Sequence, residues 1–190
     1  KMLSQIADLN FINYNREIAA QHLSDLQNND GSWSWYKSMS GNISVTSDIL
    51  EALVRIKILT GEEFSGEINR MYLSAFNYLK DEAEKCYKND IKKSGSTAEG
   101  YDIPQWLVKY LYLSNLDKSL KYDEKVNSYF IDKLKDSASS LDIYQKSLAA
   151  VIFYKSGAKS DAEDFINSLL QYTRYTKDMG RYFDTKKAKY

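Results

Sequence analysis

Chemically reactive side chains are scarce in this sequence, which has a single cysteine and a single histidine. Cys86 follows Lys85 and stands two residues before Lys88, and such neighbours could favour a reactive thiolate. A partly buried, unreactive thiol is nevertheless the simpler interpretation. His22 lies on an expected helix and is interpreted as a surface or boundary residue. A zinc site takes about four Cys, His or carboxylate ligands, and the sequence offers no such cluster, so we expect no metal site and no cofactor.

Acidic residues are plentiful, and two adjacent pairs are candidates for acid–base chemistry: Glu62 with Glu63, and Asp123 with Glu124. Both pairs come just before or at expected helix starts, where the helix dipole favours negative charge. A terpene cyclase would carry an Asp-rich acid or metal motif, and no such run occurs. We therefore expect a domain that is not an enzyme and has no catalytic residues. A polysaccharide lyase or a terpene cyclase relative is the enzymatic alternative.

The charge balance argues against nucleic acid as a partner. The chain has 26 Lys and Arg and 26 Asp and Glu, a formal net charge of zero, whereas nucleic-acid-binding faces usually carry a basic excess. No apolar run approaches the roughly 20 residues that a membrane span needs. The sequence opens in the middle of a helical pattern at Lys1-Met2-Leu3-Ser4. We expect residues 1–190 to form a single helical domain that is a fragment of a larger multidomain protein.

Apolar residues recur every three or four positions along most of the chain, which predicts helices. Trp33 and Trp35 lie in a non-helical segment, residues 32–43, and their spacing of two predicts that both point the same way. A polar loop is expected over residues 90–100. No segment alternates long enough to predict a strand, and residues 178–190 are mixed and basic. The expected helices cover about residues 2–27, with a possible break near Asn13, 46–60, 64–88, 104–115, 126–134, 141–156 and 162–170.

Seven or eight helices with single apolar stripes and short connections predict stacked antiparallel helical hairpins. Such hairpins can form an open solenoid or a closed ring. No strict repeat of roughly 34 or 40 residues is found, which weighs against the common superhelical repeats. A helical-repeat scaffold that binds partner proteins remains a second alternative.

The turn after the first expected helix distinguishes these architectures. Gln27-Asn28-Asn29-Asp30-Gly31-Ser32-Trp33 resembles the glutamine–glycine–tryptophan turn of α/α-toroid proteins, which is found in terpene cyclases and in the thioester domains of α-2-macroglobulins. In such a turn the glutamine bonds loop backbone, the glycine allows a tight reversal, and the indole covers the joint between helices. The resemblance implies an all-α fold in which helical hairpins pack as two concentric layers.

The order of motifs resembles the bacterial α-2-macroglobulin family in particular. The family's closing helices after its Met-Gly-x-Tyr segment have no counterpart, so an incomplete ring is expected. The matching segments are Asp8-Leu9-Asn10, residues 23–27, residues 29–36, Ser44-Val45-Thr46, residues 144–150 and residues 176–183.

One departure from the family concerns its thioester, which forms within Cys-Leu-Glu-Gln. Cys86 is followed by Tyr87-Lys88-Asn89, so this chain contains no thioester. The resemblance implies a non-catalytic domain of a bacterial protease inhibitor that traps endopeptidases, in the periplasm or anchored to the outer membrane. Its expected partners are the other domains of the same polypeptide and the target proteases, with no nucleic acid and no small-molecule cofactor.

Three aromatic residues beside the turn are the candidates for an interaction patch: Trp33, Trp35 and Tyr36. Exposed apolar groups that lie together commonly mark surfaces for partners. The structural interpretation of the same residues is a hydrophobic plug that fixes the turn, and the sequence favours it.

Overall fold

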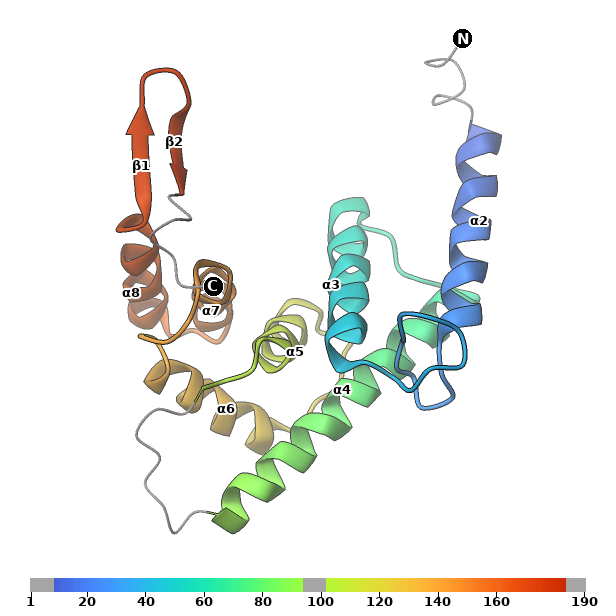
Figure 1. The fold of residues 1–190 in the computed structure, drawn as a ribbon, viewed down its shortest axis with the longest axis horizontal. Coiled ribbons are helices and arrows are strands. Elements are labelled where there is room, and N and C mark those ends of the chain that lie inside the picture. Colours follow the sequence, from blue (N-terminus) through green and yellow to red (C-terminus); the bar gives the residue numbers. More distant parts are fainter. Residues whose placement is uncertain (1–8, 94–101, 184–190) are drawn as a thin grey trace. The chain divides into compact units, whose positions relative to one another are not determined.

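The computed structural model describes residues 9–93 and 102–183, and within these ranges it contains seven helices and one two-stranded sheet (Figure 1). The predominantly helical character predicted from the sequence is therefore confirmed. The chain divides into two compact units, residues 1–79 and 80–190. The expectation of a single domain remains a prediction, because two compact units can belong to one domain.

The first unit consists of α2 (Leu9–Leu26), α3 (Ile43–Thr60) and the first part of α4 (Gly66–Lys93). Residues 11–19 of α2 are exposed, so this helix packs mainly through its C-terminal end. Most of the core comes from α3 and α4, where burial of one large apolar side chain contributes roughly 1.5–3 kcal/mol. The buried apolar side chains of this unit are Trp33, Val45, Leu50, Leu53, Val54, Met71, Tyr72, Ala75, Phe76 and Leu79.

Two boundaries in the first unit differ from the sequence expectation. The helix α2 runs without a break through Asn13, and residues 2–8 of the expected helix lie outside the described residues. The helix α3 begins three residues before Thr46, because the side chain of Asn42 caps it by accepting a hydrogen bond from the Val45 amide at 3.0 Å. Its predicted end is confirmed, since Gly61 has a left-handed φ of 67° and donates its N–H to the helix.

The second unit contains the rest of α4, then α5 (Gln105–Leu116), α6 (Glu124–Asp136), α7 (Ile143–Lys155) and α8 (Lys159–Leu170). The helix α7 packs against both α5 and α8. Phe153 of α7 and Phe165 of α8 stack with ring centroids 5.3 Å apart. Two aspartates fix helix starts: Asp123 accepts amide hydrogen bonds at the start of α6, and Asp142 forms a capping box with Gln145 on α7.

Lysine and tyrosine pairs help to bury charge in the second unit. Lys146 is only 5% exposed, and its ammonium donates hydrogen bonds to Ser168 at 3.0 Å and to the Tyr172 hydroxyl at 3.3 Å. The same ammonium lies 5.0 Å from the centroid of the Tyr172 ring. Lys109 lies in the same way over Tyr144 at 5.3 Å. Such contacts partly replace lost hydration, which gives the abundant tyrosines a structural role.

The chain after α8 forms a β-hairpin, so the expectation that no strand occurs is wrong. Strands β1 (Thr173–Thr176) and β2 (Gly180–Phe183) pair antiparallel, with Thr173 opposite Phe183. Each strand has four residues, too few for alternation to be recognised in the sequence. The expected loop over residues 90–100 is also wrong in its first part, because α4 continues to Lys93, and residues 94–100 lie outside the described residues.

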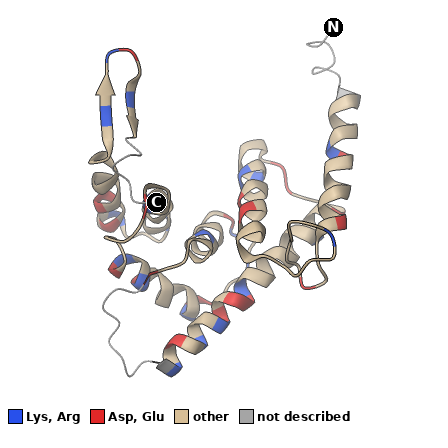
Figure 2. Ribbon diagram, viewed as in Figure 1, with Lys and Arg blue, Asp and Glu red and all other residues tan. Residues whose placement is uncertain are grey.

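Acidic and basic residues are interspersed along the described helices (Figure 2), and several of them form ion pairs. Glu67 and Arg70 are 3.2 Å apart on α4, and Glu84 and Lys88 are 3.4 Å apart further along the same helix. Pairs at this spacing stabilise a helix by about 0.2–0.5 kcal/mol each.

Candidate interaction site

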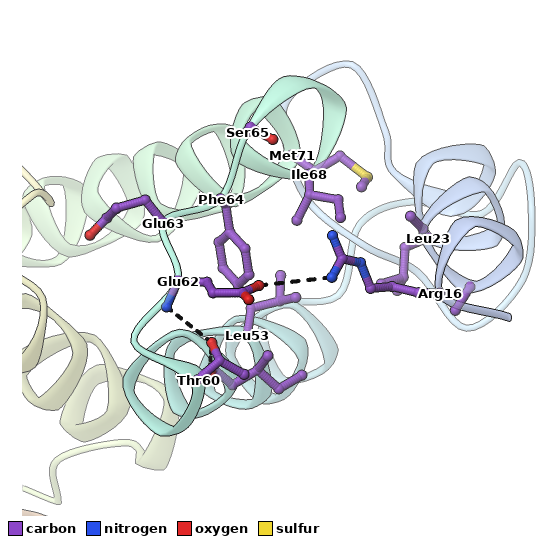
Figure 3. A pocket seen from close by; sticks show the side chains of 13 residues that line it. Arg16, Leu23, Leu53, Thr60, Glu62, Glu63, Phe64, Ser65, Ile68 and Met71 are labelled. Atoms are coloured by element: carbon purple, nitrogen blue, oxygen red, sulfur yellow. Dashed lines mark hydrogen bonds and ion pairs between the residues drawn. The ribbon is translucent and has the colours of Figure 1, made fainter. Parts of the chain in front are cut away.

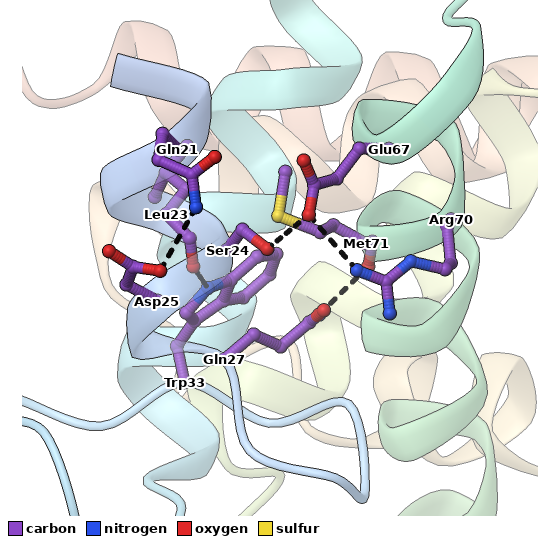
Figure 4. Close-up of polar contacts among 9 residues, drawn as sticks. All are labelled: Gln21, Leu23, Ser24, Asp25, Gln27, Trp33, Glu67, Arg70 and Met71. Atoms are coloured by element: carbon purple, nitrogen blue, oxygen red, sulfur yellow. Dashed lines mark hydrogen bonds and ion pairs between the residues drawn. The ribbon is translucent and has the colours of Figure 1, made fainter. Parts of the chain in front are cut away.

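The turn that follows α2 is tied to α4 by the side chain of Gln27. Its amide nitrogen donates to the carbonyl oxygen of Gly31 at 3.0 Å. It also donates to the carbonyl oxygen of Met71 at 2.9 Å (Figure 4). An amide NH₂ group has two donors, so both hydrogens are used. The backbone of Gln27 also forms an antiparallel bridge with Trp33. The predicted role of this glutamine, bonding loop backbone at a helix end, is confirmed.

Gly31 allows the turn to approach α4 closely. Its φ is 88°, a left-handed value that other residues rarely adopt. A Cβ atom at this position would lie 2.3 Å from the carbonyl oxygen of Ser74. Conformation and space therefore both require glycine, as the sequence predicted for a tight reversal.

The indole of Trp33 fills the space beneath the turn and is fully buried. Its Nε1 donates to the carbonyl oxygen of Leu23 at 2.8 Å, which satisfies one of the last carbonyls of α2 (Figure 4). Its backbone N–H donates to the Thr46 hydroxyl at 2.8 Å, and its carbonyl accepts from the Asn42 amide at 2.8 Å. One residue thus connects the end of α2 to the start of α3. Trp33 is the plug of the joint and takes no part in a surface patch.

A second polar connection joins α2 to α4. The hydroxyl of Ser24 donates to a carboxylate oxygen of Glu67 at 2.5 Å, and the same oxygen accepts from Arg70 at 3.2 Å (Figure 4).

The three residues of the turn itself, Gln27, Gly31 and Trp33, are referred to below as the turn joint.

Beyond the turn joint, Trp35 and Tyr36 project from the loop and are 68% and 72% exposed. Trp33 is buried and Trp35 is exposed, so the two indoles do not share one side as the sequence predicted; the chain bends at Trp35 and Tyr36 rather than continuing extended. Met39 lies in the same loop and is 49% exposed, a member that the sequence interpretation missed. We call Trp35, Tyr36 and Met39 the aromatic tip.

The loop that carries the aromatic tip is held by its own hydrogen bonds. The carbonyl oxygen of Tyr36 accepts from the Ser34 hydroxyl at 2.7 Å and from the Met39 amide at 3.2 Å. Ser38 has a φ of 70°, which costs energy in a residue other than glycine. An ordered loop presents large apolar side chains with less entropy to lose on binding. The arrangement suits contact with a partner surface.

The residues considered for chemistry take other roles. Burial raises the pKa of the Cys86 thiol, and the carboxylates of Asp90 and Glu82 raise it further. The thiol is therefore held neutral, as the sequence favoured. His22 lies on the exposed side of α2. No group of three or more His, Cys, Asp or Glu that could hold a metal ion occurs within the described residues.

The acidic pairs are engaged in local structure. Asp123 caps α6, Glu63 lies 2.7 Å from the Lys57 ammonium, and Glu62 lies 3.8 Å from the Arg16 guanidinium. None of the described helices is long and apolar enough to cross a membrane.

Comparisons with protein-family models, with curated proteins and with solved structures give no match to this chain. The resemblance to α-2-macroglobulins therefore remains a prediction from the sequence motifs.

Proposed function

We propose that this chain is a non-catalytic α/α-toroid-type interaction domain of a bacterial α-2-macroglobulin-like protein. The observation that carries the proposal is the turn joint, in which Gln27, Gly31 and Trp33 perform the three tasks that the toroid turn requires. The resemblance supplies the rest: a protein of the cell envelope that traps attacking proteases through a bait region elsewhere in the polypeptide.

The aromatic tip supplies the surface through which such a domain would contact its neighbours. Tryptophan and tyrosine are enriched where proteins bind one another, since each offers a large apolar area together with a polar handle. Trp35 and Tyr36 are more than two-thirds exposed, while the turn joint connects α2, α3 and α4 through hydrogen bonds. The proposed partners are other domains of the same polypeptide, which enclose the target protease when they move against this domain.

A trapping assay on the full protein that carries this chain tests the proposal. Trypsin is added, and its hydrolysis of casein and of a small chromogenic peptide are measured in parallel. Enclosure of the protease predicts that casein hydrolysis falls while peptide hydrolysis persists. The double variant Trp35→Ala, Tyr36→Ala is expected to restore casein hydrolysis, whereas the exposed control Tyr154→Ala behaves as the unmodified protein.

Three results would contradict the proposed function. Casein and peptide hydrolysis that both continue would exclude trapping, and loss of both would indicate a conventional active-site inhibitor. Turnover of a polysaccharide or an isoprenoid diphosphate by the chain would support the enzymatic alternative instead.

A further inference from the structure

An apolar cavity of about 260 Å³ opens between α2, α3 and the first turn of α4 in the first unit. Its walls are formed mainly by aliphatic and aromatic side chains, among them Leu23, Leu53, Phe64 and Ile68 (Figure 3). An apolar protein cavity of about 150 Å³ is known to take up benzene. The space in this chain is larger, so it accommodates a benzyl or isobutyl group together with the atoms that attach it.

The mouth of the cavity carries charged side chains of both signs, Arg16, Glu62 and Glu63. Figure 3 shows Arg16 reaching from α2 toward Glu62, which lies in the connection between α3 and α4. Their closest atoms, Nη1 and Oε2, are 3.8 Å apart, and the side chains are 67% and 72% exposed. At this distance the Arg16 guanidinium and the Glu62 carboxylate form an ion pair without a hydrogen bond. A pair of this kind contributes about 0–1 kcal/mol, so a ligand can replace it readily.

The second acidic side chain at the mouth is already paired with a lysine. Glu63 also lines the cavity, but its carboxylate lies 2.7 Å from the Lys57 ammonium. That pair is neutral as a unit. Arg16 and Glu62 are therefore the groups whose charges a ligand would meet.

We propose that this cavity binds a zwitterionic apolar α-amino acid. The side chain occupies the apolar space, the α-carboxylate pairs with Arg16, and the α-ammonium pairs with Glu62. A guanidinium can form two parallel hydrogen bonds with a carboxylate. An amino acid brings both charges within a few bonds of its apolar group, which matches a mouth with one cation and one anion 3.8 Å apart.

Ligands with a single charge fit this mouth less well. An apolar carboxylate would pair with Arg16 but approach Glu62, and like charges repel. An apolar amine would reverse the problem. A side chain inserted by a partner protein would carry neither charge, because its α-amino and α-carboxyl groups are in peptide bonds. The proposal does not depend on the proposed function, since only residues of the cavity and its mouth enter it.

The test is an NMR titration of the ¹⁵N-labelled chain with L-phenylalanine. Three analogues are titrated in parallel: 3-phenylpropionate, phenethylamine and N-acetylphenylalanine amide. We expect shifts confined to residues around the cavity, and binding of L-phenylalanine about tenfold tighter than that of any analogue, since each analogue loses at least one charge-assisted contact.

Variants assign the binding to the named groups. Arg16→Gln and Glu62→Gln should each weaken L-phenylalanine binding about tenfold. Glu17→Gln is the matched control, because Glu17 is an exposed α2 residue that does not line the cavity. Ala20→Phe places a ring in the cavity from a half-exposed position of α2 and should abolish binding of all four compounds, while the remaining spectrum shows that the chain is folded.

The proposal would be overturned by any of three results. Absence of shifts with L-phenylalanine would show that the cavity takes no such ligand. Equal binding of all four compounds would show a site selective for apolar groups alone. Preference for the blocked amide would indicate a site for a partner's side chain.

Discussion

The side-chain nitrogen of Gln27 lies 2.9 Å from the carbonyl oxygen of Met71, a residue 44 positions further along the chain. The same nitrogen donates to Gly31 within the turn. One amide group thus connects the turn after α2 to the helix α4. This relationship gives the turn joint its order and predicts how individual substitutions affect stability.

Replacement of Gln27 should destabilise the first unit through its lost donors. Gln27→Ala removes both hydrogen bonds, and each part-buried bond contributes about 0.5–1.5 kcal/mol. Gln27→Glu should cost more, because a carboxylate cannot donate and would face two carbonyl oxygens. Urea unfolding measures the free energy. Gln21→Ala is the control, since Gln21 bonds only to its exposed helix neighbour Asp25, and an equal loss there would contradict the assigned role.

Substitution of Gly31 should be more damaging than substitution of Gly61. Both have left-handed φ values, which cost about 1–2 kcal/mol for a residue with a Cβ. Only at Gly31 would the Cβ also collide with the backbone of Ser74, since nothing lies within 4 Å of a Cβ at Gly61. The melting temperature of Gly31→Ala should therefore fall clearly below that of Gly61→Ala. Equal melting temperatures would refute the close approach.

The two neighbouring tryptophans should respond differently to substitution. Trp33→Phe removes buried volume and leaves the Leu23 carbonyl without its indole donor, a loss of about 1–3 kcal/mol. Trp35→Phe changes an exposed side chain and should alter stability by less than about 0.5 kcal/mol. Chemical unfolding of both variants, followed by circular dichroism, checks the difference.

Alkaline pH should destabilise the second unit through Tyr110. Burial raises the pKa of its hydroxyl above the ordinary value of 10.0, and the carboxylates of Glu84 and Asp123 add to the effect. The pKa of Tyr110 is higher in the folded chain than in the unfolded chain. The stability that this residue contributes is therefore fully present below about pH 10 and is lost as the pH rises further. Tyr110→Phe should lose less free energy of unfolding between pH 9 and about 11 than the unmodified chain. The exposed control Tyr154→Phe should follow the unmodified chain.

Cys86 should react slowly with iodoacetamide. The thiolate is the reactive form, and burial together with the charges of Asp90 and Glu82 raises the pKa of this thiol above 9.0. Mass spectrometry of alkylation at pH 7.5 should therefore show slower modification of the folded chain than of the urea-unfolded chain, with the rate still rising above pH 9. Faster modification in the folded chain would indicate an activated thiol.

The sequence predicted the turn joint because its three residues act through fixed chemical properties. An amide that donates twice, a residue without Cβ and a large indole are each recognisable by type. The start of α3 was misplaced for a related reason: Asn42 and Thr46 can both cap a helix, and only the structure shows that the Thr46 hydroxyl bonds to the Trp33 amide instead.

Other features could not be predicted because they depend on contacts distant in the chain. Trp33 is buried because its indole bonds to the end of α2, whereas the chain bends at Trp35 and Tyr36, where the Ser34 hydroxyl donates to the Tyr36 carbonyl. The cavity brings Arg16 and Glu62 together from segments 46 positions apart. The periodicity of residues along a single helix cannot predict a contact between two distant segments.

The central claim is that the aromatic tip faces other domains while the turn joint stays buried. Hydroxyl-radical footprinting of the isolated chain and of the full protein that carries it tests this claim most directly. We predict that Trp35 and Tyr36 are oxidised rapidly in the isolated chain and are protected in the full protein, while Trp33 is protected in both. Equal oxidation of Trp35 and Tyr36 in the two samples would contradict the account.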